Sequence, residues 1–207
     1  MSSSFLELIK ARRSVKAYLP KEIPEAIILR IFEAAIWAPS AHNAQPWRFI
    51  VITDHDTRRK LAEAMAEVWA EDLTRDGVSV DIRRSLVESS IERFTEAPML
   101  IIACTTMEEM DRYPDERRQR LEHLMATQSL AAAIQNILLA AHSEGLSSCW
   151  FCAPLFCQDV ARKVLGIPRD VEPQALITLG YPSEQPDPPP RKPLEEVIFR
   201  NRWGERF

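Results

Sequence analysis

The chain has 207 residues, of which 46% are hydrophobic and 27% are charged, and its formal net charge is -4. This size and composition suit one soluble domain with a core of its own. The lack of a basic field argues against nucleic acid as the main partner. No uninterrupted apolar run reaches the roughly 20 residues of a membrane helix, so no membrane association is expected. The first residues do not resemble a secretion signal, and four cysteines without exported character favour reduced thiols in the cytoplasm.

Apolar spacing predicts two helices before the first strand. Residues 5–9 fit one side of a short helix, with Ser4 as its cap. Pro24 opens a second helix, whose apolar residues recur at helical spacing as far as Ile36. The run 49–52 is typical of a buried strand.

The middle of the chain alternates helices and apolar strands. Segments 55–74 and 81–95 predict two surface helices joined by a turn around Gly77. A strand follows at 98–104. The mostly apolar segment 121–144 predicts a helix central to a core or a subunit interface, and Gly145 ends it. The charged runs 108–111 and 117–120 are interpreted as solvated faces.

The last part of the chain predicts a strand at 148–151, a helix at 156–165 and a strand at 174–179. Beyond Tyr181, repeated prolines favour an extended, non-helical path. This tail also carries more apolar residues than a disordered linker usually has. No repeat or composition break divides the sequence. We therefore expect a single domain over 1–207, in which 182–207 is an arm that packs on a partner subunit.

A basic stretch follows the first predicted helix. Arg12, Arg13 and Lys16 place three cations beside the hydroxyl of Ser14. Such a group could hold a phosphate or an electron-rich ring edge, whereas the alternative is a basic helix end that offsets the helix dipole.

A loop of turn formers and amide side chains, residues 38–47, leads directly into the first strand. Loops held by rigid elements commonly carry binding residues. Within it, His42 is interpreted as a surface histidine, with proton donation as the alternative. Trp47 is interpreted as a packing residue.

The cysteines allow a second interpretation. Cys149 and Cys152, followed by Cys157 and with Cys104 on a strand, could form a redox disulfide or a metal site. Their spacing matches neither common zinc nor iron–sulfur runs, so buried structural thiols are the default. The five glycines do not cluster, so no glycine-rich phosphate loop is present, and there is no G-x-S-x-G motif.

Four motifs, in this order, carry a resemblance to a known family. They are Arg12-Arg13-Ser14-x-Lys16, Pro39-Ser40 with Asn43-x-Gln45-Pro46-Trp47, Gly145-Leu146-Ser147-Ser148-Cys149-Trp150, and Arg191-Lys192-Pro193-Leu194. Together they resemble the nitroreductase family of FMN-dependent oxidoreductases over essentially the whole chain. The third motif and the helix before it look closest to the branch that includes the flavin domain of coenzyme F420 glutamate ligases.

The resemblance implies an α+β fold, with a mixed central sheet covered by helices. It also implies a homodimer with FMN at two interface sites. Arg12, Arg13 and Ser14 would meet FMN oxygens, and Lys16 would lie near the pyrimidine end of the ring. The loop residues that would reach the flavin of the other subunit are Pro39, Ser40 and Asn43.

The same resemblance implies FMN contacts later in the chain. The backbone from Trp150 through Phe151, Cys152 and Ala153 would pass beside the reactive edge of the ring. Arg191 would bind phosphate, with Lys192 as a second candidate. Some members carry glutamate and glycine where Cys152 and Ala153 stand, which leaves the contact to N5 open. Arg93 stands where some members have a flavin-contacting lysine.

The expected activity is transfer of hydride from NAD(P)H through FMN to an acceptor such as a nitroaromatic or quinone. Ping-pong kinetics are expected, with no catalytic side chain and no metal. Two alternatives remain open: an enzyme of flavin or F420-type cofactor metabolism, and a non-catalytic flavin-binding dimer.

Overall fold

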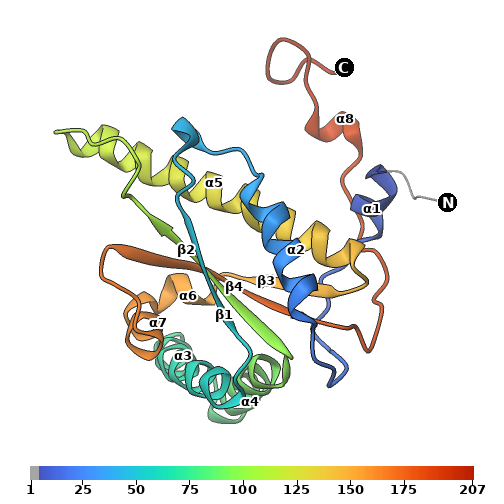
Figure 1. The fold of residues 1–207 in the computed structure, drawn as a ribbon, viewed down its shortest axis with the longest axis vertical. Coiled ribbons are helices and arrows are strands. Elements are labelled where there is room, and N and C mark those ends of the chain that lie inside the picture. The colour runs from blue at the N-terminus through green and yellow to red at the C-terminus, as the bar shows by residue number, and fades with distance from the viewer. Residues whose placement is uncertain (1–4) are drawn as a thin grey trace.

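The computed structural model describes residues 5–207, and Ser4, the expected cap, lies outside them. A four-stranded sheet forms its centre, and helices cover both faces (Figure 1). The strand order is β1-β2-β4-β3. The strands are β1 (Trp47–Ile52), β2 (Met99–Thr106), β3 (Ser147–Phe151) and β4 (Val171–Gly180). These results confirm the expected α+β class.

The sheet was expected to be mixed, but all three strand pairings in the described part are antiparallel. Within residues 5–207, the one parallel contact is the isolated bridge between Ser14 and Ser148. β3 runs in the same direction as β2, because the long helix between them carries the chain back across the sheet, but β4 lies between these two strands, so each hydrogen-bonded neighbour is antiparallel.

Alternation along β2 separates the two cores. Met99, Ile101 and Ala103 face one core, which α2 (Glu25–Ile36) and α5 (Glu116–Ser143) cover. Leu100 and Ile102 face the other core, against α3 (His55–Arg75), α4 (Val80–Glu96) and α7 (Gln158–Leu165). Side chains of successive strand residues point to opposite faces, so a strand covered on both sides must be apolar throughout.

The central helix α5 has a defined start and end. At the start, the Asp115 carboxylate accepts a hydrogen bond from the Arg118 backbone N–H at 3.0 Å. At the end, Gly145 has a φ of 75°, and the Leu146 N–H reaches the Ala141 carbonyl at 2.9 Å. By length and composition alone α5 is apolar enough to cross a membrane. Its packing between α2 and the sheet explains that composition.

Two predicted elements differ in detail. The helix expected at 156–165 is two helices, α6 (Ala153–Phe156) and α7, separated at Cys157, where φ is -146°. Pro154 favours a helix start upstream of the expected one, because proline suits the first turn. The tail also contains one helical turn, α8 (Leu194–Val197), directly after Pro193.

Residues 182–207 leave the body of the molecule as an extended arm that ends near α1 (Phe5–Ala11) (Figure 1). The arm carries exposed apolar side chains, and Trp203 is 90% exposed. Phe199 and Trp203 stack on each other, with ring centroids 4.7 Å apart.

Candidate functional site

The basic segment after α1 runs beside the edge strand of the sheet. Ser14 bridges to Ser148 of β3, and the Val15 N–H donates to the Ser148 carbonyl at 3.2 Å. Val15 is buried, whereas Ser14 and Lys16 on either side of it are exposed. An extended backbone presents alternate residues to opposite sides. The buried valine therefore fixes the segment, and the hydroxyl and the ammonium face outward.

Tyr18 anchors the end of this segment to the sheet. Its hydroxyl is 2.7 Å from Oγ1 of Thr178 and also donates to the Val15 carbonyl at 2.5 Å. Burial raises the pKa of this phenol. The phenol therefore remains protonated and serves as a structural hydrogen-bonding group.

Arginines from both ends of the chain gather at the start of the segment. The pKa of Arg12 is lowered, mainly by burial and then by the charges of Arg191 and Arg13. Within residues 5–207, no carboxylate forms an ion pair with these three arginines. Like charges held together without a counter-ion favour an anionic ligand, and a phosphate matches the geometry of guanidinium groups.

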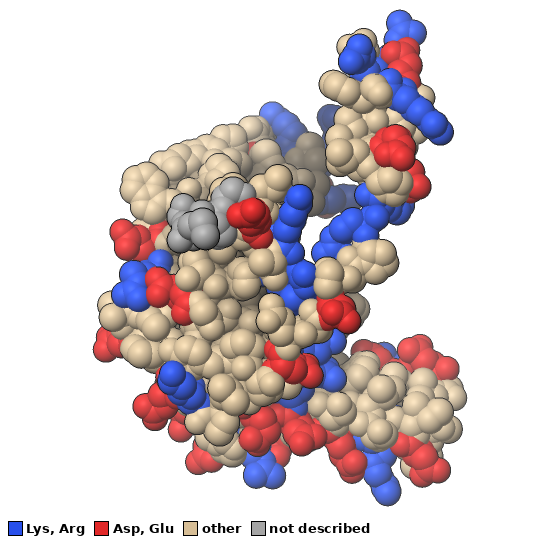
Figure 2. Space-filling model, turned by 90° about the vertical axis from the view of Figure 1, so that its right-hand side faces the viewer, with Lys and Arg blue, Asp and Glu red and all other residues tan. Residues whose placement is uncertain are grey.

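Lys and Arg side chains line the hollow between the body and the C-terminal arm (Figure 2). His142, at the end of α5, is affected by this field. Its pKa is lowered, first by burial and then by Arg12 and Arg13. The basic hollow is thus bounded by the segment directly after α1, the end of α5 and the arm.

A second pair of cations lies around Phe151, where β3 ends. The Lys16 ammonium is 5.9 Å from the Phe151 ring centroid, and the Arg93 guanidinium carbon is 5.8 Å from it. The ring also packs edge-on against Phe94, with centroids 5.1 Å apart. The structure therefore brings Arg93 of α4 together with Lys16 and β3.

The outer edge of β3 is open beyond Ser148. Since the Ser148 carbonyl accepts from Val15, the alternation of backbone groups points the Trp150 N–H to the same edge. Trp150 and Cys152 are exposed, and Ala153 is half-buried at the start of α6. This edge offers backbone donors beside Lys16.

The loop with Pro39, Ser40 and Asn43 is not part of this cluster within one chain. It lies between α2 and β1, where it contacts α5 through the Ala41 N–H, which donates to Ser129 Oγ at 3.1 Å. Pro39 and Asn43 are exposed. The loop's expected contact with the flavin of a second subunit therefore remains a prediction.

Backbone strain marks the same loop. His42, Asn43 and Gln45 have φ angles of 56°, 55° and 46°. Asparagine and histidine adopt the left-handed region more often than other residues with a Cβ, whereas glutamine does so less readily, and such outliers often occur where a loop has a function. Within the loop, Ser40 Oγ accepts a hydrogen bond from the Gln45 N–H at 3.1 Å.

All four cysteines are free thiols in the structure, and only Cys152 is exposed. Burial raises the pKa of Cys104 to about 12 and that of Cys157 to about 11. Burial also raises the pKa of Cys149, although the charges of Lys16, Arg93 and Arg12 oppose this. Raised values disfavour the nucleophilic thiolate at these three positions.

Sequence reasoning missed a pocket of about 580 Å³ next to Phe151. It is largely apolar, and two arginines lie at its wall; among its lining residues are Met65, Trp69, Arg75, Arg93, Phe94 and Phe156. These residues come from α3, α4 and α6. No motif marks them, because in the sequence they are indistinguishable from ordinary helix-packing residues.

Comparison with known proteins gives a consistent assignment. The family model described as "Nitroreductase family" matches residues 9–181. A protein of Methanothermobacter thermautotrophicus, named "Putative NADH dehydrogenase/NAD(P)H nitroreductase", is 33% identical over 183 residues, which are 87% of this chain and 78% of the relative.

Solved structures agree with this match. A BluB-like flavoprotein from Clostridium difficile 630 is 28% identical with a TM-score of 0.78, over 97% of this chain and 100% of the other. The Parabacteroides distasonis structure, described as "Putative NADH dehydrogenase/NAD(P)H nitroreductase", is 26% identical with a TM-score of 0.71, over 98% and 100%. With the family model covering most of the sequence, the chain belongs to the nitroreductase family.

Proposed function

We propose that this protein is an FMN-dependent NAD(P)H oxidoreductase that reduces electron-poor acceptors such as nitroaromatics and quinones. The observation that carries the proposal is the uncompensated cluster of Arg12, Arg13 and Arg191 beside an open strand edge and Lys16. The names of similar proteins support flavin and nicotinamide chemistry.

The donor set fits a phosphorylated, flat, electron-accepting group. Three arginines suit a phosphate dianion, whereas the hydroxyl of Ser14 and the backbone donors of β3 suit neutral oxygens and ring nitrogens. Lys16 lies 5.9 Å from Phe151, so its charge is directed at the same edge. A metal cofactor has no comparable ligand set at this position among the described residues.

Each residue has a distinct role in the proposed site. Arg12, Arg13 and Arg191 hold the phosphate and fix the position of the cofactor. Lys16 stabilises negative charge that develops at the pyrimidine end during reduction. FMN, when bound, supplies the hydride-accepting and hydride-donating chemistry.

The acceptor and NAD(P)H would use the same space in turn. The pocket beside Phe151 is largely apolar, with Arg75 and Arg93 at its wall, which suits flat substrates that carry partial or full negative charge. One shared position predicts ping-pong kinetics. A ternary-complex pattern in steady-state assays would contradict this.

A homodimer completes the proposed site. The exposed apolar side chains of the arm and of the end of α2 provide surface for a second copy: Trp37, directly after α2, is 81% exposed, and Trp203 of the arm is 90% exposed. In this arrangement Pro39, Ser40 and Asn43 serve the flavin of the neighbouring subunit. We further propose a cytoplasmic location, in keeping with the free thiols.

An absorbance spectrum of the purified protein tests the proposal directly. Bound flavin gives a yellow protein, and anaerobic NADH or NADPH should bleach it. A colourless protein that stays colourless after FMN addition would contradict the proposal and favour a non-catalytic dimer.

A second candidate is an enzyme of flavin or F420-type cofactor metabolism. It is favoured by the 28% identity to a structure described as a BluB-like flavoprotein. Mass spectrometry of the flavin before and after aerobic turnover distinguishes NAD(P)H oxidoreduction from flavin metabolism. An oxidoreductase returns FMN intact, whereas a flavin-metabolising enzyme consumes it.

A further inference from the structure

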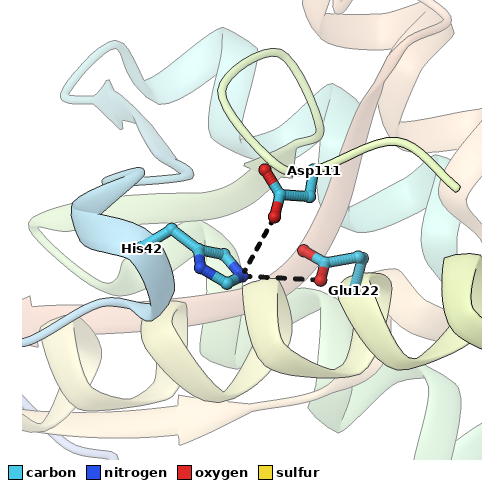
Figure 3. A group of neighbouring side chains, drawn as sticks. All are labelled: His42, Asp111 and Glu122. Atoms are coloured by element: carbon cyan, nitrogen blue, oxygen red, sulfur yellow. Dashed lines mark ion pairs between the residues drawn. The ribbon is translucent and has the colours of Figure 1, made fainter.

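Three side chains outside the basic hollow meet at one point (Figure 3). They are His42 from the 3-10 turn η1 (Ala41–Asn43), Asp111 from the turn after β2, and Glu122 from α5. His42 Nε2 lies 3.4 Å from Glu122 Oε1 and 4.0 Å from Asp111 Oδ2. Sequence reasoning placed His42 on the surface and Asp111 on a solvated face, and it did not connect them.

Glu122 is the group that needs an explanation. It is 2% exposed, and its Oε2 atom has no hydrogen-bond partner among the described residues. A buried carboxylate without partners is costly, because no water or donor replaces its hydration. Its Oε1 atom lies 3.4 Å from His42 Nε2, so the side chain is directed into the cluster (Figure 3), and Oε2 is the atom left without a partner among the described residues.

The backbone holds the imidazole in place at an energetic cost. His42 has a φ of 56° in η1, a conformation disfavoured for a side chain with a Cβ. The Asn43 φ of 55° extends the strain. The turn is also fixed to α5 by the hydrogen bond from Ala41 to Ser129.

The three ligand atoms lie within 4.8 Å of one another. Tetrahedral ligands of a first-row ion are separated by about 3.4 Å, given metal–ligand distances near 2.0–2.1 Å. The distance between His42 Nε2 and Glu122 Oε1 already matches this ligand-to-ligand separation. Asp111 is exposed and free to approach. His42 and Asp111 are both exposed, so water can reach the outer side of the cluster as a further ligand.

Charge and ligand type narrow the choice of ion. A neutral imidazole with two carboxylates carries two negative charges, which a divalent cation neutralises. The imidazole favours Zn²⁺ and related transition ions over Mg²⁺, which takes oxygen ligands and keeps its waters. We propose that His42, Asp111 and Glu122 bind a divalent first-row transition-metal ion of the Zn²⁺ class, which ties the η1 turn and the β2–α5 turn to α5.

Isothermal titration of the chelator-treated, full-length protein with ZnCl₂ tests this site. We expect one Zn²⁺ per chain and a higher Tm when zinc is present at about a hundredfold excess over its Kd. The same concentration of MgCl₂ should give neither effect. His42→Ala and Glu122→Gln should each weaken the titration at least about tenfold.

Two controls separate this site from other zinc ligands. His55→Ala removes an exposed histidine that pairs with Asp56, and it should leave the titration unchanged. Cys152→Ser removes the exposed thiol and should also retain the site. His42 is exposed, so its variant folds even if Glu122→Gln does not. Absence of zinc binding, or binding that survives His42→Ala, would overturn the proposal.

Discussion

Arg12 and Arg191, at opposite ends of the chain, lie close enough that the charge of Arg191 lowers the pKa of Arg12. Neither has a carboxylate partner within the described residues. The fold thus holds two cations together in a basic hollow that the arm closes on one side (Figure 2). Such repulsion is relieved when a dianion binds between them.

Arg191→Ala is expected to weaken FMN binding roughly ten- to hundredfold, because a charge-assisted hydrogen bond to phosphate is lost. Quenching of FMN fluorescence during titration measures the change. Riboflavin lacks the phosphate, so its affinity should be the same in the variant and the wild type. Arg202→Ala, an exposed arginine of the same arm, is the matched control. Equal losses for FMN and riboflavin would contradict a phosphate role.

Lys16→Met should slow reduction of the bound flavin by NAD(P)H at least about tenfold, because a positive charge no longer stabilises the developing anion. Anaerobic stopped-flow absorbance gives the rate, and the flavin's reduction potential should fall as well. Lys21→Met is the control, since Lys21 also lies over an aromatic ring, 4.1 Å from the Tyr181 centroid, but is not near Phe151. An unchanged potential in Lys16→Met would remove this residue from the ring site.

His142 provides a spectroscopic probe of phosphate binding. Burial, Arg12 and Arg13 together hold its pKa below 6.5. A bound phosphate compensates the two arginine charges, so the pKa should rise on addition of FMN. It should not rise with riboflavin. NMR titration of the imidazole signals measures the shift, and a pKa that is equally low in both complexes would place the phosphate elsewhere.

Much of the fold follows from apolar spacing. The start of α2 after Pro24 can be predicted because its apolar residues recur at helical spacing. The fully buried β2 can be predicted because its sequence is one uninterrupted apolar run. The break between α6 and α7 is not readable in this way. It depends on a single backbone angle at Cys157, which local sequence leaves undetermined.

The site is less accessible to sequence reasoning than the fold. The proximity of Arg12 and Arg191 came from the family resemblance, since no spacing rule relates two ends of a chain. No sequence motif indicated the cluster around Glu122. A glutamate near the start of a charged helix resembles a solvated residue. His42 and Asn43 have positive φ angles, but neither is a glycine, the residue that usually indicates such a conformation in a sequence.

Gly180→Ala is expected to destabilise the fold by about 1–3 kcal/mol through overpacking. A Cβ at this position would lie 2.8 Å from Tyr18 Cδ1 and 2.9 Å from Pro98 Cδ. Denaturant unfolding measures the loss, with Ser147→Ala at the paired position of β3 as the control. Because Tyr18 anchors the basic segment, FMN affinity should fall as well. Unchanged stability would mean that the segment shifts without cost.

Mixed dimers can test whether the 39–45 loop acts across the subunit interface. Asn43→Ala and Arg12→Ala homodimers should both bind FMN weakly, since every site in each lacks one contact. If Asn43 acts on the neighbouring subunit, a heterodimer of the two variants has one site with both residues intact and one site with neither. That heterodimer, purified with two different affinity tags, should bind one FMN with wild-type affinity. If both residues served the same subunit, each site would keep one defect and no tight binding would be recovered.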